Sequence, residues 1–210
     1  MCKNLPRFLL VATALAFVFA PAKPASSAWL DGVKEIRIGE RTFPVCPDEY
    51  LVKKGLSVRE VPDDQNAAIE YVKAINLYVK PPDELDDLYH YVMRNGWIDE
   101  ADKLVPWLQK NAPAIAAVRE GAKKNDCKFP VFGESPVSRY KLLLREVQQM
   151  KALARLLAIQ GKYLEYQKKY REALDTYLVI SKMGYHASRE PFLISGLVGI
   201  VCDSIAAKRI

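Results

Sequence analysis

The chain has 210 residues, of which 50% are hydrophobic and 27% are charged, and its formal net charge is +6. This length and apolar content suit one folded domain with a sizeable core, and they exclude an intrinsically disordered chain. The basic residues do not form a dense run of Lys and Arg with interleaved aromatic side chains, so we expect no nucleic-acid partner.

Residues 1–28 have the three parts of a secretory signal peptide. Lys3 and Arg7 form a basic head, an apolar run over residues 8–20 follows, and Ser26-Ser27-Ala28 is a small-residue cleavage site. The apolar run is shorter than the roughly 20 residues that span a bilayer. We therefore expect cleavage near Ala28 and export of the mature chain to the periplasm or the cell exterior.

Residues 29–62 are expected to form a short β-hairpin and a loop. Ile36 and Ile38 alternate on one side of Gly39-Glu40, and Phe43 and Val45 alternate on the other. This pattern is typical of two strands joined by a tight turn. Because a lone hairpin is marginally stable in water, it should pack against a helix.

Three cysteines follow the signal segment. Cys46 and Cys127 lie in loop-like stretches, whereas Cys202 lies in an apolar helical pattern. In an oxidising compartment the favoured pairing is a Cys46–Cys127 disulfide. The alternative is three unpaired and mostly buried thiols, because sequence alone does not supply the geometry of a disulfide.

From residue 63 onward the apolar residues recur with a helical period, so residues 63–210 are predicted to form an all-α domain. Asp63 or Asp64 is placed to cap the first helix, and Pro81-Pro82 stops it. The next helices are predicted over residues 83–93 and 99–110, the second with a kink or break at Pro106. A helix over residues 111–124 follows, with Asn111 as its cap and Pro113 in its first turn. The longest helix begins at Ser138, another covers residues 170–183 and ends at Gly184, and the last begins near Pro191.

Two stretches resemble the helical hairpin of the tetratricopeptide repeat (TPR). In residues 161–184, Tyr170, Ala173 and Tyr177 have the aromatic, small, aromatic spacing of the second helix of the repeat, and Gly161 stands at its glycine position. The earlier stretch fits the same register through Leu88, Gly96, Ala101 and Pro113. The resemblance implies helices packed as antiparallel pairs. The second half of the chain also resembles a group of exported bacterial helical proteins without an assigned activity.

The closing segment, residues 192–210, is apolar but too short to anchor the chain in a membrane. On a helix its small residues gather on one face and its large apolar residues on the opposite one. We expect the broad apolar face to be buried in the body and the small face to admit a closely packed helix. If the small face is outermost, the chain is an adequately capped monomer. If the broad face lacks a partner within the chain, it predicts a homodimer or a bound protein.

Four tyrosines are the candidate partner-binding residues: Tyr163, Tyr166, Tyr170 and Tyr177. They recur along two consecutive helices, where a groove lined by them could hold a peptide through ring faces and hydroxyls. Simple packing between helices would produce the same spacing. The predicted function is therefore an exported, non-enzymatic helical scaffold that binds a protein or peptide, or binds itself through the last helix.

Two other classes of function stay open. Asp87 and His90 have the spacing of a helix-borne metal site, which would make the chain a metal-dependent hydrolase, but no second motif of this kind supplies further ligands. Apolar space between helices could instead carry a small molecule or lipid. His186 is placed at a helix end, where a cation complements the helix dipole. No catalytic constellation is found, so neither an enzyme nor a cofactor is expected.

Overall fold

The structure is a computed structural model that describes residues 35–38, 41–44, 60–130, 136–189 and 193–207. The side chains of residues 36, 38, 41, 43, 44, 136–148 and 193 are outside this description. The predicted signal segment and Cys46 lie outside the described residues. Within them α-helices dominate, which confirms the prediction of a helical domain.

The helices of the described residues are α2 (Ala67–Leu77), α3 (Asp86–Asn95), α4 (Val105–Lys110), α5 (Ala112–Lys123), α6 (Pro136–Tyr166), α7 (Tyr170–Ser188) and α8 (Leu193–Ala207). Short 3-10 turns precede three of them: η2 (Asp63–Gln65), η3 (Asp83–Leu85) and η4 (Asp99–Leu104). The predicted helix over residues 99–110 is thus divided, and Pro106 lies in the first turn of α4, where a missing backbone N–H costs nothing.

Two short strands precede the helices. β1 (Glu35–Ile38) and β2 (Arg41–Pro44) are antiparallel, with Ile36 opposite Phe43 and Ile38 opposite Arg41. β1 packs against α2. The predicted turn at Gly39-Glu40 lies outside the described residues.

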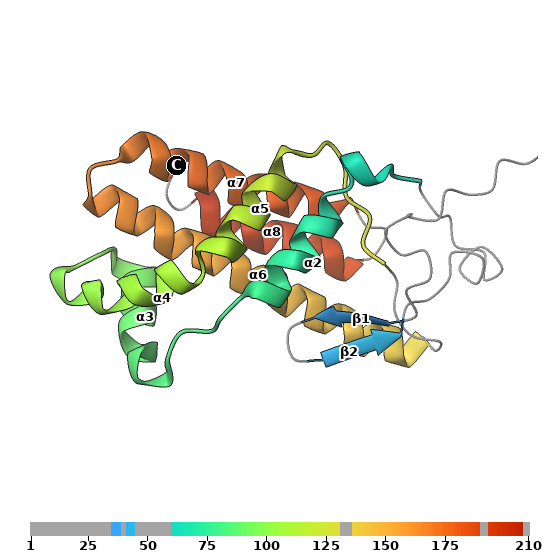
Figure 1. The fold of residues 1–210 in the computed structure, drawn as a ribbon, viewed down its shortest axis with the longest axis horizontal. Helices are drawn as coiled ribbons and strands as arrows, with labels where there is room; N and C mark the ends of the chain where they lie inside the picture. The colour runs from blue at the N-terminus through green and yellow to red at the C-terminus, as the bar shows by residue number, and fades with distance from the viewer. Residues whose placement is uncertain (1–34, 39–40, 45–59, 131–135, 190–192, 208–210) are drawn as a thin grey trace, which may run out of the picture.

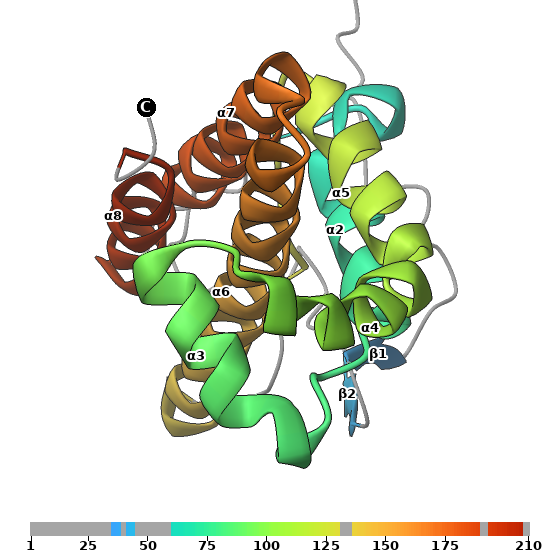
Figure 2. The same ribbon diagram turned by 90° about the vertical axis from the view of Figure 1, so that its left-hand side faces the viewer.

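The helices form two layers that share one core (Figure 1). One layer is the antiparallel pair α2 and α5, and the other contains α6, α7 and α8, which follow one another as antiparallel neighbours. The end-on view in Figure 2 shows α3 and α4 lying across one end of both layers. The largest apolar side chains of the shared core are almost completely buried: Ile75, Leu104, Leu153, Leu156, Leu157, Ile159, Ile180 and Met183.

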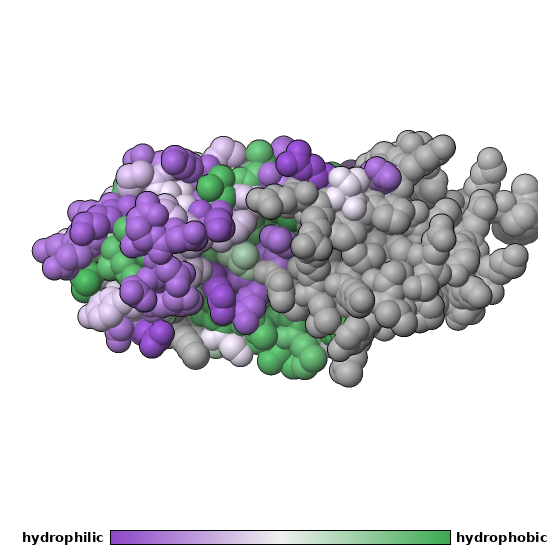
Figure 3. Space-filling model, turned by 90° about the horizontal axis from the view of Figure 1, so that it is seen from below, coloured by the Kyte–Doolittle hydropathy of each residue, from purple (hydrophilic) through white to green (hydrophobic). Residues whose placement is uncertain are grey.

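The α3 end of the molecule is strongly polar on its outer surface. Figure 3 shows hydrophilic side chains gathered over this end, where exposed acids lie on η3, α3 and η4: Asp83, Glu84, Asp86, Asp87, Asp99, Glu100 and Asp102. Beneath them, Trp97 is buried, and its indole Nε1 donates to Asp102 Oδ1 at 3.2 Å. Trp97 therefore connects this charged surface to the core, because its ring is buried and its Nε1 bonds to a surface carboxylate.

A glycine that faces a tyrosine sets the close approach of α2 and α5. Gly121 on α5 lies against the ring of Tyr71, and a Cβ added at Gly121 would be 2.7 Å from Tyr71 Cε1. The same arrangement recurs between α6 and α7, where a Cβ at Gly161 would be 2.5 Å from Tyr177 Cε1. In both pairs the missing side chain makes room for a buried aromatic ring.

Two buried asparagines fasten the ends of the α2/α5 pair. Asn66 caps α2 by accepting from the Ala68 N–H at 3.1 Å, and its side chain also bonds to both backbone groups of Lys128, beyond the end of α5. Asn111 stands before α5 and bonds to both backbone groups of Val79, beyond the end of α2. Each residue thus ties the start of one helix to the chain that leaves the other.

These bonds correct two predicted caps. The cap of α2 is Asn66 and not Asp63 or Asp64, because the acids lie in the 3-10 turn that precedes the helix. Asn111 makes no side-chain cap to α5, because its amide is used by Val79 and by the Trp107 carbonyl. Pro113 is in the first turn of α5, as predicted.

The end predicted for α7 at Gly184 is wrong, since α7 continues to Ser188. Gly184 instead lets α8 approach: a Cβ there would lie 3.0 Å from the Gly199 carbonyl oxygen and 2.9 Å from Cys202 Cβ. A small residue facing another helix thus has the same sequence signature as a helix terminator.

The close packing confirms that another helix approaches the small face of α8, but the broad face is buried only in part, since Val201 and Ile205 are half-buried. Ser195, Val198, Gly199, Cys202 and Ala206 are buried, whereas Leu197 and Ile200 are 52% and 63% exposed. Contact between the two backbones at Gly184 and Gly199 fixes the rotation of α8 and turns these two larger side chains outward.

Candidate binding groove

An open groove of about 430 Å³ lies between α5 and α7, two helices that are not neighbours in sequence. It is lined by Ala116, Arg119, Glu120, Ala122, Lys123, Asp175, Leu178, Val179 and Lys182. The α5 wall of the groove is shallow at two positions, because Ala116 and Ala122 have small side chains. Leu178 on the α7 side is 51% exposed, so the groove offers apolar surface to a ligand.

Arg119 joins the groove to the helical body. Its guanidinium Nη2 donates to Thr176 Oγ1 at 2.7 Å and to Gln160 Oε1 at 3.4 Å, which links α5 to α7 and α6. Thr176 is fully buried and donates in turn to the Glu172 carbonyl at 2.7 Å. Because two acceptors hold the guanidinium, Arg119 acts as a wall of the groove rather than a mobile charge.

Opposite charges stand along the rim. On α5, Lys123 Nζ lies 2.6 Å from Glu120 Oε1, so these charges largely compensate each other. On α7, Asp175 and Lys182 are seven positions apart, which is about 10 Å along a helix axis. The α7 rim therefore has an acidic end and a basic end on either side of Leu178 and Val179.

The structure divides the four predicted tyrosines between two kinds of environment. Tyr177 is 1% exposed and donates to Glu165 Oε1 at 2.9 Å, while the half-buried Tyr163 ring packs on Trp97 with centroids 4.7 Å apart. Burial raises the pKa of Tyr177 far above its usual value, and the hydrogen bond to Glu165 adds to this effect. These two rings belong to helix packing.

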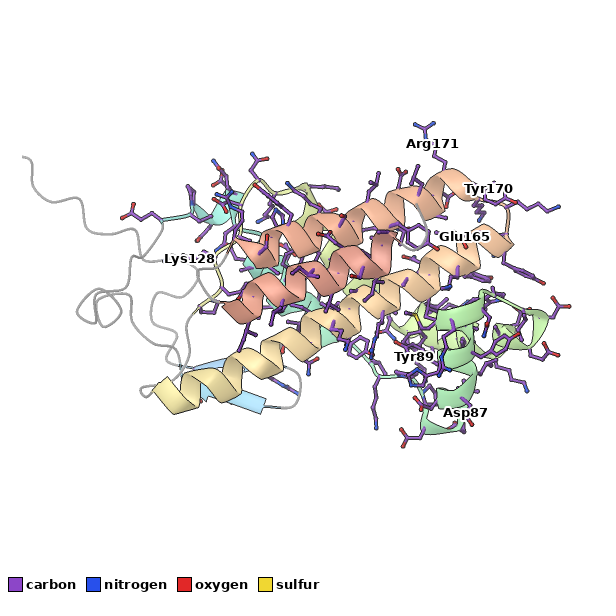
Figure 4. All side chains as sticks on the ribbon, turned by 180° about the vertical axis from the view of Figure 1, so that it is seen from behind. Asp87, Tyr89, Lys128, Glu165, Tyr170 and Arg171 are labelled. Atoms are coloured by element: carbon purple, nitrogen blue, oxygen red, sulfur yellow. The ribbon has the colours of Figure 1, made fainter. Side chains whose placement is uncertain are left out.

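Tyr166 and Tyr170 lie at the α6–α7 turn and are 46% and 65% exposed. Tyr166 donates to Asp99 Oδ1 at 2.5 Å, a hydrogen bond that raises the tyrosine pKa. Tyr170 lies at the outer end of α7 beside Arg171 (Figure 4). Neither tyrosine lines the α5–α7 groove, so the structure does not bring the four together in one groove.

The candidate metal pair on α3 is not assembled as predicted. His90 Nε2 lies 3.6 Å from Asp86 Oδ1 rather than beside Asp87, which is exposed on the outer side of α3 (Figure 4). Among the described residues, no group of three or more His, Cys, Asp or Glu side chains could hold a metal ion. The pair alone has too few donors for a catalytic metal.

His186 lies in the last turn of α7, as the sequence predicted, but its side chain points into the core instead of standing at the surface as a cation. It is fully buried on α7, and its Nδ1 is 2.8 Å from the Tyr71 hydroxyl of α2. Burial, together with the positive charge of Lys182, lowers the pKa of His186 to about 4. A neutral imidazole in this place links the two layers through Tyr71, a contact between residues 115 positions apart that no local pattern indicates.

Two cysteines within the described residues, Cys127 and Cys202, lie near the buried Tyr71. Cys127 and Cys202 are both fully buried. Burial raises the pKa of the Cys202 thiol to about 12, so it is a poor nucleophile at neutral pH. Because Cys46 lies outside the described residues, the Cys46–Cys127 disulfide stays a prediction.

Comparison of the chain with protein families, with curated proteins and with solved structures finds no match. Among the described helices, none has both the length and the apolar character required to cross a membrane. The case for a function therefore depends on the geometry of the site.

Proposed function

We propose that the protein is an exported, non-enzymatic helical scaffold that binds a segment of another protein in the groove between α5 and α7. The observation that carries the proposal is an open groove with exposed apolar surface at Leu178 and a rim of both charges. Apolar contact with a few fixed charges is the usual composition of a protein-recognition surface.

The occupant that fits best is an amphipathic helix of the partner. Two neighbouring helices present ridges and a groove into which a third helix packs. Its apolar residues would cover Leu178 and Val179, a basic residue would face Asp175, and an acidic residue would face Lys182. Because the two α7 charges are about two helical turns apart, we expect the complementary charges at positions i and i+7.

The tetratricopeptide-like character of the helices is part of this proposal. The consecutive antiparallel helices α6, α7 and α8, with Tyr177 packed on Gly161, support it. The first layer departs from a simple repeat, because α2 packs on α5 and not on the next helix in sequence. Tyr166 and Tyr170 remain proposed as a second contact region at the α6–α7 turn.

One pair of substitutions on α7 tests the groove. Leu178→Glu places a charge in the groove, whereas Leu174→Glu changes a comparably exposed leucine one turn away that does not line it. A partner captured by in-cell cross-linking of the tagged chain and then purified should bind the Leu178→Glu variant about tenfold more weakly or worse. Binding to Leu174→Glu should be unchanged.

Equal affinity of both variants for the purified partner would contradict the groove assignment. If only Tyr170→Ala weakened binding, the contact would move to the α6–α7 turn. Thermal unfolding of each variant shows whether weaker binding results from unfolding of the variant.

Export is proposed from the sequence of residues 1–28. The N-terminal peptide of the protein recovered from cells should begin just after Ala28. Recovery of a peptide that contains Lys3 or Arg7 from the mature protein would contradict cleavage.

A further inference from the structure

Three cations lie along one face of α6 without a carboxylate partner among the described residues. Lys151, Arg155 and Lys162 stand at positions i, i+4 and i+11, which fall within about 40° of one another around a helix. The ion pairs of the described residues involve none of the three. Because an unpaired charge is costly inside a protein, this face lacks the negative charge that would balance it.

Lys162 is the most unusual of the three. It is 2% exposed, and its buried Nζ has no hydrogen-bond partner. Glu165, one turn later on α6, accepts from Tyr177 instead. Side chains of a helix tilt toward its N-terminus, so the Lys162 side chain leads toward Arg155, two turns earlier, across the single methyl group of Ala158. Lys162 is therefore the buried end of the cationic face, and the half-buried Arg155 is its accessible end.

Two tyrosine hydroxyls lie near the guanidinium of Arg155. The charge of Arg155 acts on the hydroxyls of Tyr78 and Tyr89, and Tyr89 stands where α3 meets α6 (Figure 4). Burial raises the pKa of both tyrosines, so the hydroxyls are protonated at neutral pH and can donate. The charge of Asp86 also reaches Tyr89, but its Oδ1 is paired with His90 Nε2 at 3.6 Å.

The face thus combines two cations and two hydroxyl donors with no carboxylate to receive them. A single carboxylate would leave one cation unbalanced, whereas a phosphate monoester carries a charge of about −1.5 to −2 at neutral pH and offers three acceptor oxygens. A guanidinium also binds phosphate oxygens in a bidentate manner. We propose that this face of α6 binds a phosphate group, which is held by Arg155, Lys162 and the two tyrosine hydroxyls. The site shares no lining residue with the α5–α7 groove, so it does not depend on the proposed function.

Isothermal titration calorimetry of the purified protein at low ionic strength, with glycerol 3-phosphate as the probe, tests the site. Wild type should bind it with a dissociation constant below about 1 mM. Arg155→Gln removes the bidentate cation and should weaken binding about tenfold or more. Arg171→Gln, at an exposed position of α7 (Figure 4), is the matched control and should bind like wild type.

Lys162→Met removes the buried charge and keeps an unbranched side chain of similar length. Without phosphate, this variant should unfold at a temperature at least as high as wild type, because it no longer buries an unpaired ammonium. Glycerol 3-phosphate should raise the unfolding temperature of wild type and leave that of Lys162→Met unchanged. An increase of equal size in both proteins overturns the proposal.

Vesicles that contain phosphatidic acid distinguish the two sources of a phosphate group. Binding of glycerol 3-phosphate without binding to the vesicles indicates a soluble phosphate monoester. Co-sedimentation with the vesicles that Lys162→Met abolishes indicates a lipid headgroup, and both outcomes support the phosphate site. Equal affinity for acetate overturns it in favour of a carboxylate site, as does a wild-type protein that binds neither glycerol 3-phosphate nor the vesicles.

Discussion

At the scale of single residues, glycines decide how closely the helices pack. Gly161 and Gly121 each face a tyrosine ring that is at most 1% exposed, and Gly184 faces the backbone of α8. The ring of Tyr177 has little freedom to move away from Gly161, because its hydroxyl is bonded to Glu165. A glycine normally weakens a helix by up to about 1 kcal/mol relative to alanine. Here the packing that it permits outweighs that cost.

Gly161→Ala should therefore destabilise the protein, although alanine is the better helix former. A Cβ 2.5 Å from Tyr177 Cε1 forces a shift in a closely packed core, for which we expect a loss of roughly 1–3 kcal/mol. Gly196→Ala is the matched control, because open space at this position predicts a gain of up to about 1 kcal/mol. Urea unfolding measures both changes in stability, and a stabilised Gly161→Ala variant would contradict this packing.

His186 gives the protein a pH-dependent stability. Its pKa of about 4 in the folded chain is below the ordinary value of 6.5, because burial and Lys182 disfavour the charged form. The unfolded chain therefore takes up a proton first as the pH falls. Stability from this residue is complete above about pH 6.5, decreases toward pH 4, and changes by about 3 kcal/mol in total.

The contribution of His186 is isolated by comparison with His186→Gln, whose amide can still bond to the Tyr71 hydroxyl. Urea unfolding at several values between pH 7 and pH 4 should show a steeper loss of stability in wild type than in the variant. Other groups titrate equally in both proteins, so the difference reports His186. Parallel curves would show that this imidazole is not held in its neutral form.

At the scale of elements, buried asparagine side chains help to fix the ends of α2 and α5. Asn111 is fully buried and its amide bonds to the Val79 N–H, the Val79 carbonyl and the Trp107 carbonyl. Removing this amide leaves the partly buried Val79 N–H without its partner, whereas the Val79 carbonyl still accepts from Trp107 Nε1 and the Trp107 carbonyl still accepts from the Asn111 N–H. Such a loss costs more than an ordinary hydrogen bond contributes.

Asn111→Ala should lower the free energy of unfolding by about 2 kcal/mol. Asn95→Ala removes an exposed amide that donates to the Tyr91 carbonyl and should change stability by less than about 0.5 kcal/mol. Chemical denaturation of the two variants measures the difference. Equal and small effects would mean that the α2/α5 pair does not need its asparagine ties.

The sequence predicted the positions of the helices better than it predicted how the helices pack on one another. The helical period located the helices, and Met150, Ala154 and Leu157, which recur at helical spacing in α6, are buried. The end of α7 was misplaced because Gly184 serves a contact with α8 that no local pattern shows. The burial of α8 was predicted only in part, because close backbone contact at Gly184 and Gly199 competes with burial of Leu197 and Ile200, and only the folded partner decides between them.

The candidate site depends even more on non-local contacts. The sequence suggested tyrosines with helical spacing, but Tyr163 and Tyr177 are used in packing. The groove arises where α5 meets α7, which are separated in the chain by the whole of α6. Arg119, Asp175 and Leu178 come from these separate helices. Arginine, aspartate and leucine are all common on helix surfaces, so only the packing of the two helices identifies these residues as one site.

At the scale of the whole molecule, the interior side chains stabilise the fold and the surface carries the candidate binding groove. The interior contains Tyr71, His186 and the buried cysteines, whose contacts or burial hold the layers together. The α5–α7 groove and the outer face of α8 open on different sides of α7.

The most direct measurement of the central claim is photo-cross-linking in cells from a single reactive side chain placed in or beside the groove. A photoreactive amino acid at position 178 lies in the groove, and the same residue at position 174 lies on the same helix outside it. The proposed function predicts one reproducible cross-linked protein from position 178 and none, or far less, from position 174. Equal cross-linking from both positions, or none from position 178 with a correctly folded protein, would contradict the binding groove.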